Sequence, residues 1–278
     1  MTQKEKAIVF NQLHHNDKLL VLPNIWDPLG ALLLESSGYP AVATASAAVA
    51  FSNGFDDGEI IPFENVLGIL KKITAAVGIP VTADIESGYA DNDAELYHNV
   101  QRLIGTGIVG VNIEDTDSKT KHFFPVEIQC QRINTIRKAA DEMGVPIFIN
   151  ARTDVFLHGE TFSTPQQKLD ETVARGLAYK KAGADCLFPI AMKQQEDIQK
   201  LISSVQMPVN ILAIPGVPAL YTLNEIGVAR VSLGSSFLKI AIRAMKTLAL
   251  ELKNSEGLSS ITENEITTDI LKKLVNKN

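Results

Sequence analysis

The chain alternates between short apolar runs and longer segments with helical spacing, and the pattern repeats eight times. The runs are rich in Val, Ile and Ala, and they do not alternate between apolar and polar residues. That character is typical of parallel strands covered on both faces. Turns containing Gly or Pro precede several runs, as expected where a helix ends and a strand begins. The predicted strands are residues 19–26, 41–45, 81–85, 109–114, 147–150, 186–190, 209–213 and 230–233.

Eight β–α units in a chain of 278 residues predict a (β/α)8 barrel of the TIM type. A doubly wound open sheet is the alternative, but the first predicted strand is not followed by the G-x-G-x-x-G of that nucleotide-binding fold. Residues 237–278 predict a C-terminal helical extension of two or three helices. No low-complexity linker divides the chain, so we expect residues 1–278 to form a single barrel domain.

Charge and cysteine content exclude several classes of protein. The chain has 26 Lys and Arg residues against 32 Asp and Glu, a net charge of −6, and no basic run, so nucleic acid and membrane partners are not expected. Its most apolar stretch, residues 41–51, is shorter than the roughly 20 residues that span a bilayer. The N-terminus lacks the layout of a signal peptide, which favours a cytoplasmic protein. Cys130 and Cys186 fit no metal-binding pattern and are interpreted as free thiols.

Carboxylates follow the third and fourth predicted strands. Asp84 and Glu86 end one strand, and Glu114 ends the next. In a barrel these ends meet at the face that carries active sites, where like charges need protons or a cation to coexist. Oxygen ligands without His or Cys favour Mg2+ or Mn2+. The alternative is that these residues are strand-end caps and solvated loop carboxylates.

Other polar groups are expected at the same face. Arg152 could bind a substrate carboxylate through two hydrogen bonds, or it could pair with Asp154 or Glu114. The small residues Ser46 and Ala47 leave backbone N–H groups open to an anionic oxygen. Trp26 ends the first predicted strand and is a further candidate for substrate binding.

The polar segment 116–125 follows the fourth predicted strand and ends in Pro125. It is interpreted as a mobile lid, and Lys119, Lys121 or His122 could supply charge or a proton when the lid closes. A solvated loop without a catalytic group is the alternative. His14, His15, His98 and His158 have no partnering pattern and are interpreted as surface residues.

Motifs along the chain resemble those of the isocitrate lyase and phosphoenolpyruvate mutase superfamily: D-D-G at 56–58, A-D-I-E-S-G-Y at 83–89, N-I-E-D at 112–115 and N-A-R-T-D at 150–154. The resemblance implies a (β/α)8 barrel in which Asp57, Asp84, Glu86 and Glu114 hold the metal. It implies that Arg152 binds substrate and that Ser46, Ala47 and Asn210 contact it. Glu86 stands where the family usually has its principal metal-ligand Asp.

The resemblance also implies an activity: a Mg2+-dependent enzyme that processes an α-oxo or α-hydroxy acid through a pyruvate-type enolate. The lid lacks the Cys of the 2-methylisocitrate and isocitrate lyases, and Thr116 follows N-I-E-D where the phosphonate mutases have Lys. We expect cleavage of a C–C bond by a lyase or decarboxylase. The alternatives are C–P chemistry like that of phosphoenolpyruvate mutase or phosphonopyruvate hydrolase, and a non-catalytic dicarboxylate binder. The family's tetramers and the apolar segment 237–252 predict a homo-oligomer.

Overall fold

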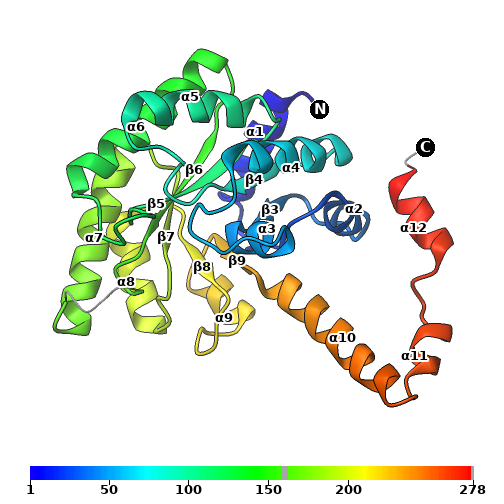
Figure 1. The fold of residues 1–278 in the computed structure, drawn as a ribbon. Coiled ribbons are helices and arrows are strands. Elements are labelled where there is room, and N and C mark those ends of the chain that lie inside the picture. The colour runs from blue at the N-terminus through cyan, green and yellow to red at the C-terminus, as the bar shows by residue number, and fades with distance from the viewer. Residues whose placement is uncertain (158–161, 277–278) are drawn as a thin grey trace.

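A computed structural model describes residues 1–157 and 162–276 and shows parallel strands surrounded by helices (Figure 1). The strands are all parallel to their neighbours. One sheet has the order β2-β3-β4-β5-β6-β7 and the other β1-β9-β8. The strand bounds are β1 Leu20–Leu22, β2 Asn24–Ile25, β3 Val42–Thr44, β4 Val81–Asp84, β5 Gly110–Glu114, β6 Phe148–Thr153, β7 Cys186–Pro189, β8 Asn210–Leu212 and β9 Arg230–Ser232.

The two sheets join at two seams to close a barrel. At one seam β1 and β2 are consecutive and separated only by Pro23, which has no N–H to donate to a ladder. At the other seam, a single parallel bridge pairs Leu187 of β7 with Val209, which directly precedes β8. The first predicted strand is therefore split in two, and the predicted (β/α)8 barrel is confirmed.

Helices cover the outside of this ring. One or two follow each strand from β2 to β8, whereas β1 is followed directly by β2 and β9 by three helices. Their starts follow the local sequence: Thr2 and Thr164 form capping boxes with Glu5 and Gln167 at the first turns of α1 and α7. The helix bounds are α1 Gln3–Leu13, α2 Pro28–Ser36, α3 Ser46–Ser52, α4 Phe63–Ala76, α5 Asp93–Ile104, α6 Val126–Met143, α7 Pro165–Lys181, α8 Gln195–Val205, α9 Leu220–Glu225, α10 Ser236–Lys253, α11 Leu258–Thr262 and α12 Thr268–Val275.

Polar side chains occupy much of the barrel interior. Asn150 donates to Asn112 on the neighbouring strand at 2.7 Å, and Asn210 contacts Ser232 at 3.0 Å. Arg230 is fully buried, and its Nε donates to Ser232 Oγ at 3.1 Å. The barrel interior is therefore hydrogen-bonded as well as packed, unlike the branched apolar layers usual in this fold.

Helix α1 packs against β6 and buries His14, contrary to the prediction of a surface residue. His14 is 3% exposed, its ring stacks on Phe148 with 4.0 Å between centroids, and Nδ1 donates to the Phe10 carbonyl at 2.9 Å. His14 follows the buried Phe10 by four residues and therefore lies on the same side of the helix. Whether that side is buried at His14 depends on how α1 packs against the barrel. His15 and His98 are exposed as predicted, and His158 lies outside the described residues.

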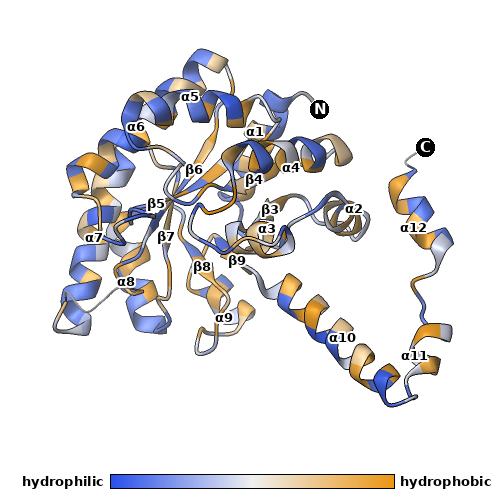
Figure 2. Ribbon diagram, viewed as in Figure 1, coloured by the Kyte–Doolittle hydropathy of each residue, from blue (hydrophilic) through white to orange (hydrophobic). Residues whose placement is uncertain are grey.

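The last three helices, α10 to α12, extend away from the barrel before α12 returns to contact α2 (Figure 1). None of them has a buried residue. Figure 2 shows apolar residues along all three helices. Several of those on α10 are more than half exposed: Ile240, Ile242, Met245 and Leu250. Among the described residues, no helix is both long and apolar enough to cross a membrane.

Candidate active site

Two adjoining cavities lie at the C-terminal ends of the strands and share Asp57 and Arg152. The first, of about 230 Å³, is called the carboxylate pocket because Glu86, Glu114 and Asp154 also line it. The second, of about 300 Å³, is called the serine pocket and is lined on its polar side by Asn24, Ser46, Asp84, Asn112 and Ser232. Its other wall is apolar and includes Leu157, Phe188, Ile190 and Leu212. A larger cavity beside residues 14–19 contains none of the predicted site residues.

Asp84 ends β4 and faces the serine pocket. Its Oδ2 accepts hydrogen bonds from the backbone N–H and the hydroxyl of Ser46, at 3.1 and 3.0 Å. Its Oδ1 is buried and has no hydrogen-bond partner in the structure. A buried carboxylate oxygen without a donor is unfavourable, so this atom is available to a cation or a ligand.

Glu86 is 5% exposed and adopts the left-handed backbone region, with φ at 51°. Glu86 belongs to a turn that follows β4, in which the Gly88 N–H donates to the Ile85 carbonyl at 2.7 Å. Burial, and then the negative charges of Asp57 and Asp84, raise the pKa of Glu86 to about 8. The Tyr89 hydroxyl donates to its carboxylate at 3.3 Å. These carboxylates therefore repel one another in the absence of a cation.

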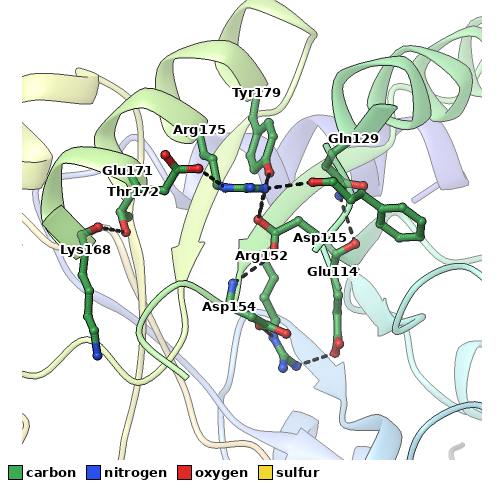
Figure 3. A network of polar contacts seen from close by, with 11 residues as sticks. Glu114, Asp115, Gln129, Arg152, Asp154, Lys168, Glu171, Thr172, Arg175 and Tyr179 are labelled. Atoms are coloured by element: carbon green, nitrogen blue, oxygen red, sulfur yellow. Dashed lines mark hydrogen bonds and ion pairs between the residues drawn. The ribbon is translucent and has the colours of Figure 1, made fainter. Parts of the chain in front are cut away.

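Arg152 lies between two carboxylates (Figure 3). It donates from NH1 to Glu114 and from Nε to Asp154 at 2.6 Å. Burial raises the pKa of Glu114 well above its usual range, although the Arg152 charge opposes this effect. Strand β6 continues to Thr153, three residues beyond its predicted end, so Arg152 projects from the strand itself. Both ion pairs that the sequence offered as an alternative for Arg152 are present, and its side chain still lines both cavities.

The donor set fits a hard cation, although the carboxylates are not gathered into one cage. Among the described residues, no three His, Cys, Asp or Glu side chains form a metal-binding group. Mg2+ usually keeps several waters and binds through only one or two carboxylates, so a three-residue cage is not needed. Asp84, with its unpartnered Oδ1, could hold the ion directly, and Asp57, Glu86 and Glu114 could hold its waters.

The predicted lid lies over the carboxylate pocket. A bridge between Thr116 and Phe123 makes residues 116–123 a short hairpin, and Ser118 donates to Glu59 at 2.5 Å. Lys121 lines the pocket, and its Nζ lies close to Gly58. A Cβ atom added to Gly58 would be 3.1 Å from this nitrogen. Lys119 instead points to solvent, where it is 68% exposed and pairs with Asp91. His122 is also exposed.

The remaining predicted site residues divide between the pockets and the core. Ser46 and Ala47 line the serine pocket. Asn210 is fully buried and contacts Ser232, and it is Ser232 that lines the serine pocket. Trp26 packs against the core. Asn210 and Trp26 line neither of the two cavities. Cys130 lies on α6 outside both pockets, so the structure offers no lid thiol in its place.

Several residues of the site carry no sequence signal that marks them. Glu59 accepts from Ser87, Ser118 and the backbone N–H of Tyr89, and so joins three loops of the rim. Asp115, Arg175 and Tyr179 form a buried network behind Arg152 (Figure 3). The N-I-E-D motif contained Asp115, but residues on α7 could be assigned to the site only once α7 was packed against β6.

Comparisons with known proteins agree on one family. The family model described as phosphoenolpyruvate phosphomutase matches residues 10–253. The 2-methylisocitrate lyase of Escherichia coli (strain K12) is 29% identical over 232 residues, covering 81% of this chain and 75% of that protein. A Burkholderia cenocepacia J2315 structure provisionally assigned as a phosphonomutase is 38% identical, with a TM-score of 0.84 over 91% of this chain and 99% of its own.

A third match is informative for the fold alone. A phosphonopyruvate hydrolase solved with oxalate and Mg2+ is 21% identical to this chain, with a TM-score of 0.85. The alignment covers 99% of this chain and 95% of the hydrolase.

Proposed function

This chain belongs to the phosphoenolpyruvate phosphomutase family, and from that premise we propose a Mg2+-dependent lyase or decarboxylase that cleaves a C–C bond of an α-oxo or α-hydroxy acid. As a member of the isocitrate lyase and phosphoenolpyruvate mutase superfamily, the chain is an enzyme. The observation that carries the proposal is the unpartnered Oδ1 of Asp84, beside repelling carboxylates and across from Arg152.

In this proposal the metal, Arg152 and the residues of the serine pocket have different roles. A bound Mg2+ would supply positive charge next to the oxygen on which negative charge develops as the bond breaks. Arg152, held by Glu114 and Asp154, would orient the substrate carboxylate, because its guanidinium is fixed at two of its nitrogens. Ser46 and Ala47 would contact the substrate from the serine pocket.

Lys121 would be the cation of the hairpin that donates a proton to the enolate or carbanion formed when the C–C bond breaks. It lines the carboxylate pocket, whereas Lys119 is tied to Asp91 on the outer side. We therefore assign the proposed lid role to Lys121 and withdraw it from Lys119. The hairpin over the pocket would also exclude water from the reaction.

A second candidate function is supported by one comparison. The 38% identity to the provisional phosphonomutase favours C–P chemistry on a phosphonate, with Lys121 beside the phosphonyl group. A non-catalytic binder of dicarboxylates would use the same pockets without turnover. We also propose a cytoplasmic location, which rests on the sequence features above.

Calorimetric titration with oxalate tests the proposal, since oxalate resembles the planar enolate of pyruvate. We expect binding in Mg2+, loss of binding in excess chelator, and weakening of about tenfold or more in Asp84→Asn, the size expected for loss of one charged contact. Asp269→Asn, at a carboxylate 85% exposed on α12, is the matched control and should bind as the wild type does. Equal affinity with and without metal would contradict the metal site.

A substrate panel then separates the functions. Turnover of oxaloacetate, 2-methylisocitrate or a dialkylmalate supports the C–C enzyme. Turnover of phosphonopyruvate alone would replace it with C–P chemistry. Metal-dependent oxalate binding without any turnover would support the binder.

A further inference from the structure

Arg175 on α7 contacts two parts of the molecule that face the carboxylate pocket from different sides. Its side chain is 7% exposed, and Nε pairs with Glu171 one turn earlier, at 2.7 Å. The NH1 nitrogen is directed toward the end of β5 and the base of the hairpin 116–123, and it also donates to the Tyr179 hydroxyl one turn later on α7, at 3.0 Å. An arginine held in this way has a fixed direction, because its planar guanidinium cannot rotate without breaking the Nε bond.

The first contact leads to Arg152 (Figure 3). Asp115 accepts from Arg175 NH1 at 3.1 Å and from the Tyr179 hydroxyl at 2.8 Å through the same oxygen, Oδ2. Its other oxygen accepts from the backbone N–H of Asp154 at 3.0 Å. Asp154 in turn holds Arg152 Nε. Three links thus connect α7 to the guanidinium that lines both pockets.

The second contact holds the hairpin. Arg175 NH1 lies 3.3 Å from the Phe124 carbonyl, and the guanidinium stacks over the Phe123 ring at 5.0 Å. Phe123 forms the bridge that closes the hairpin, and the Phe124 N–H donates to the Asp115 carbonyl at 2.8 Å. Arg132 stacks on Phe124 from α6 at 4.5 Å, so the hairpin base is held between two arginines.

The burial of Asp115 makes this network stiff. Asp115 is fully buried, and its loss of a hydrogen-bond donor would leave an unpaired carboxylate in that position, which is strongly unfavourable. Displacement of Arg175 would therefore move Asp115, and with it the loop that carries Asp154. The hairpin base would shift in the same movement, because Arg175 NH1 contacts both Asp115 and the Phe124 carbonyl.

We propose that Arg175 is a positioning residue that fixes Arg152 and the hairpin 116–123 in one arrangement, with Tyr179 supporting the Arg152 side of the network. The inference rests on the proposed function only in that Arg152 binds the substrate. Arg175 and Tyr179 do not line either pocket and act through Asp115 and Phe123.

The test uses two measurements on the full chain. Trypsin cleavage after Lys119 and Lys121, without ligand and below the unfolding temperature, reports how firmly the hairpin is held. Oxalate affinity in Mg2+ reports the placement of Arg152. Arg175→Gln should raise the cleavage rate about fivefold or more and weaken oxalate about tenfold or more, as expected for a buried charged hydrogen bond.

Tyr179→Phe removes the hydroxyl that contacts Asp115 and Arg175 NH1, and it leaves the Arg175 contacts with Phe123 and Phe124 in place. It should weaken oxalate severalfold and leave hairpin cleavage within about twofold of the wild-type rate, since Arg175 still holds Phe123 and Phe124. Arg175→Lys keeps the charge but cannot both pair with Asp115 and stack on Phe123, so its cleavage should also rise. This variant decides the hairpin side if Arg175→Gln does not fold.

Matched controls are Arg102→Gln, which removes a half-exposed arginine on α5, and Tyr221→Phe at a tyrosine 70% exposed on α9. Both should behave as wild type in both measurements. Wild-type cleavage and wild-type oxalate affinity in folded Arg175 variants would overturn the inference. A wild-type protein that fails to bind oxalate would instead overturn the proposed function, and the cleavage rates would still decide whether Arg175 holds the hairpin.

Discussion

At the scale of the residue, burial shifts the pKa of several side chains in this molecule. Arg230 is fully buried with both terminal nitrogens unpartnered, and burial lowers the pKa of its guanidinium to about 10. His14 lies near it. Burial, and then the Arg230 charge, lower the pKa of His14 to about 3, so the ring stays neutral in the folded protein.

His14 should make the protein less stable in mild acid. Its folded pKa is lowered from 6.5, so as the pH falls below 6.5 the unfolded chain takes up a proton that the folded protein refuses. The contribution lost between pH 7 and pH 5 is about 2 kcal/mol. Urea unfolding at the two pH values measures it, and His14→Phe, which keeps the ring against Phe148, should reduce the pH dependence by that amount. An unchanged pH dependence in His14→Phe would show that His14 does not titrate as its burial implies.

Residues at strand ends were predictable from the β–α pattern, whereas the roles of residues in the hairpin 116–123 were not. Asp84, Glu114 and Arg152 were found because the β–α pattern assigns strand ends to one face of the barrel. The choice between Lys119 and Lys121 depends on the positive φ of Lys121 and on the pairing of Lys119 with Asp91, and neither follows from the local sequence. Asn210 was placed on the correct strand, but its burial against Ser232 required the packed barrel.

At the scale of the element, the close approach of helices to strands depends on glycine at particular positions. Gly176 lies within α7, and a Cβ there would come within 2.6 Å of Leu187 on β7 and 2.9 Å of Val205 on α8. Gly68 lies within α4, on its exposed side, and a Cβ there would meet nothing within 4 Å. Gly176 is therefore needed for close packing of α7, whereas Gly68 is not needed for packing.

Substitution by alanine should have opposite effects at these two sites. Gly176→Ala should destabilise the protein by about 1–2 kcal/mol, because overpacking against Leu187 exceeds the gain in helix propensity. Gly68→Ala should stabilise it by about 0.5–1 kcal/mol through helix propensity alone. Urea or thermal unfolding of both variants checks this pair. Stabilisation by Gly176→Ala would show that Leu187 moves aside more easily than its burial suggests.

The sequence predicted the order of elements better than their limits. Strand 147–150 proved to end three residues later, because β6 pairs with β5 up to Arg152 and with β7 up to Thr153. Strand 19–26 proved discontinuous because Pro23 interrupts the ladder. Both differences come from pairing with distant strands, which a single segment does not encode.

At the scale of the whole molecule, the exposed apolar surface of α10 to α12 is the main feature that one chain leaves unexplained. Side chains such as Ile242 and Met245 are 52% and 66% exposed, and exposed apolar patches of this kind commonly mark interfaces. We propose that a second copy of the chain covers this surface, within the homotetramer that the sequence predicts.

Light scattering at micromolar concentration checks this assembly. We expect four times the chain mass of 30.2 kDa for the wild type and a smaller species for Met245→Glu, because a buried charge would disfavour the interface. Lys246→Glu, at the neighbouring polar position of α10, tests whether any new carboxylate on this helix has the same effect. A wild-type mass of a single chain would remove the proposal.

The pairing of β1 with β9 also has a consequence for the nascent chain on the ribosome. Leu20 to Leu22 pair in register with Arg230 to Ser232, and the described residues pair β1 with no other strand. The first strand to be translated must therefore wait for the last strand of the described residues. Until residue 232 has left the exit tunnel, β1 has no partner within its own chain, so we expect chaperones that bind apolar segments to bind it during translation.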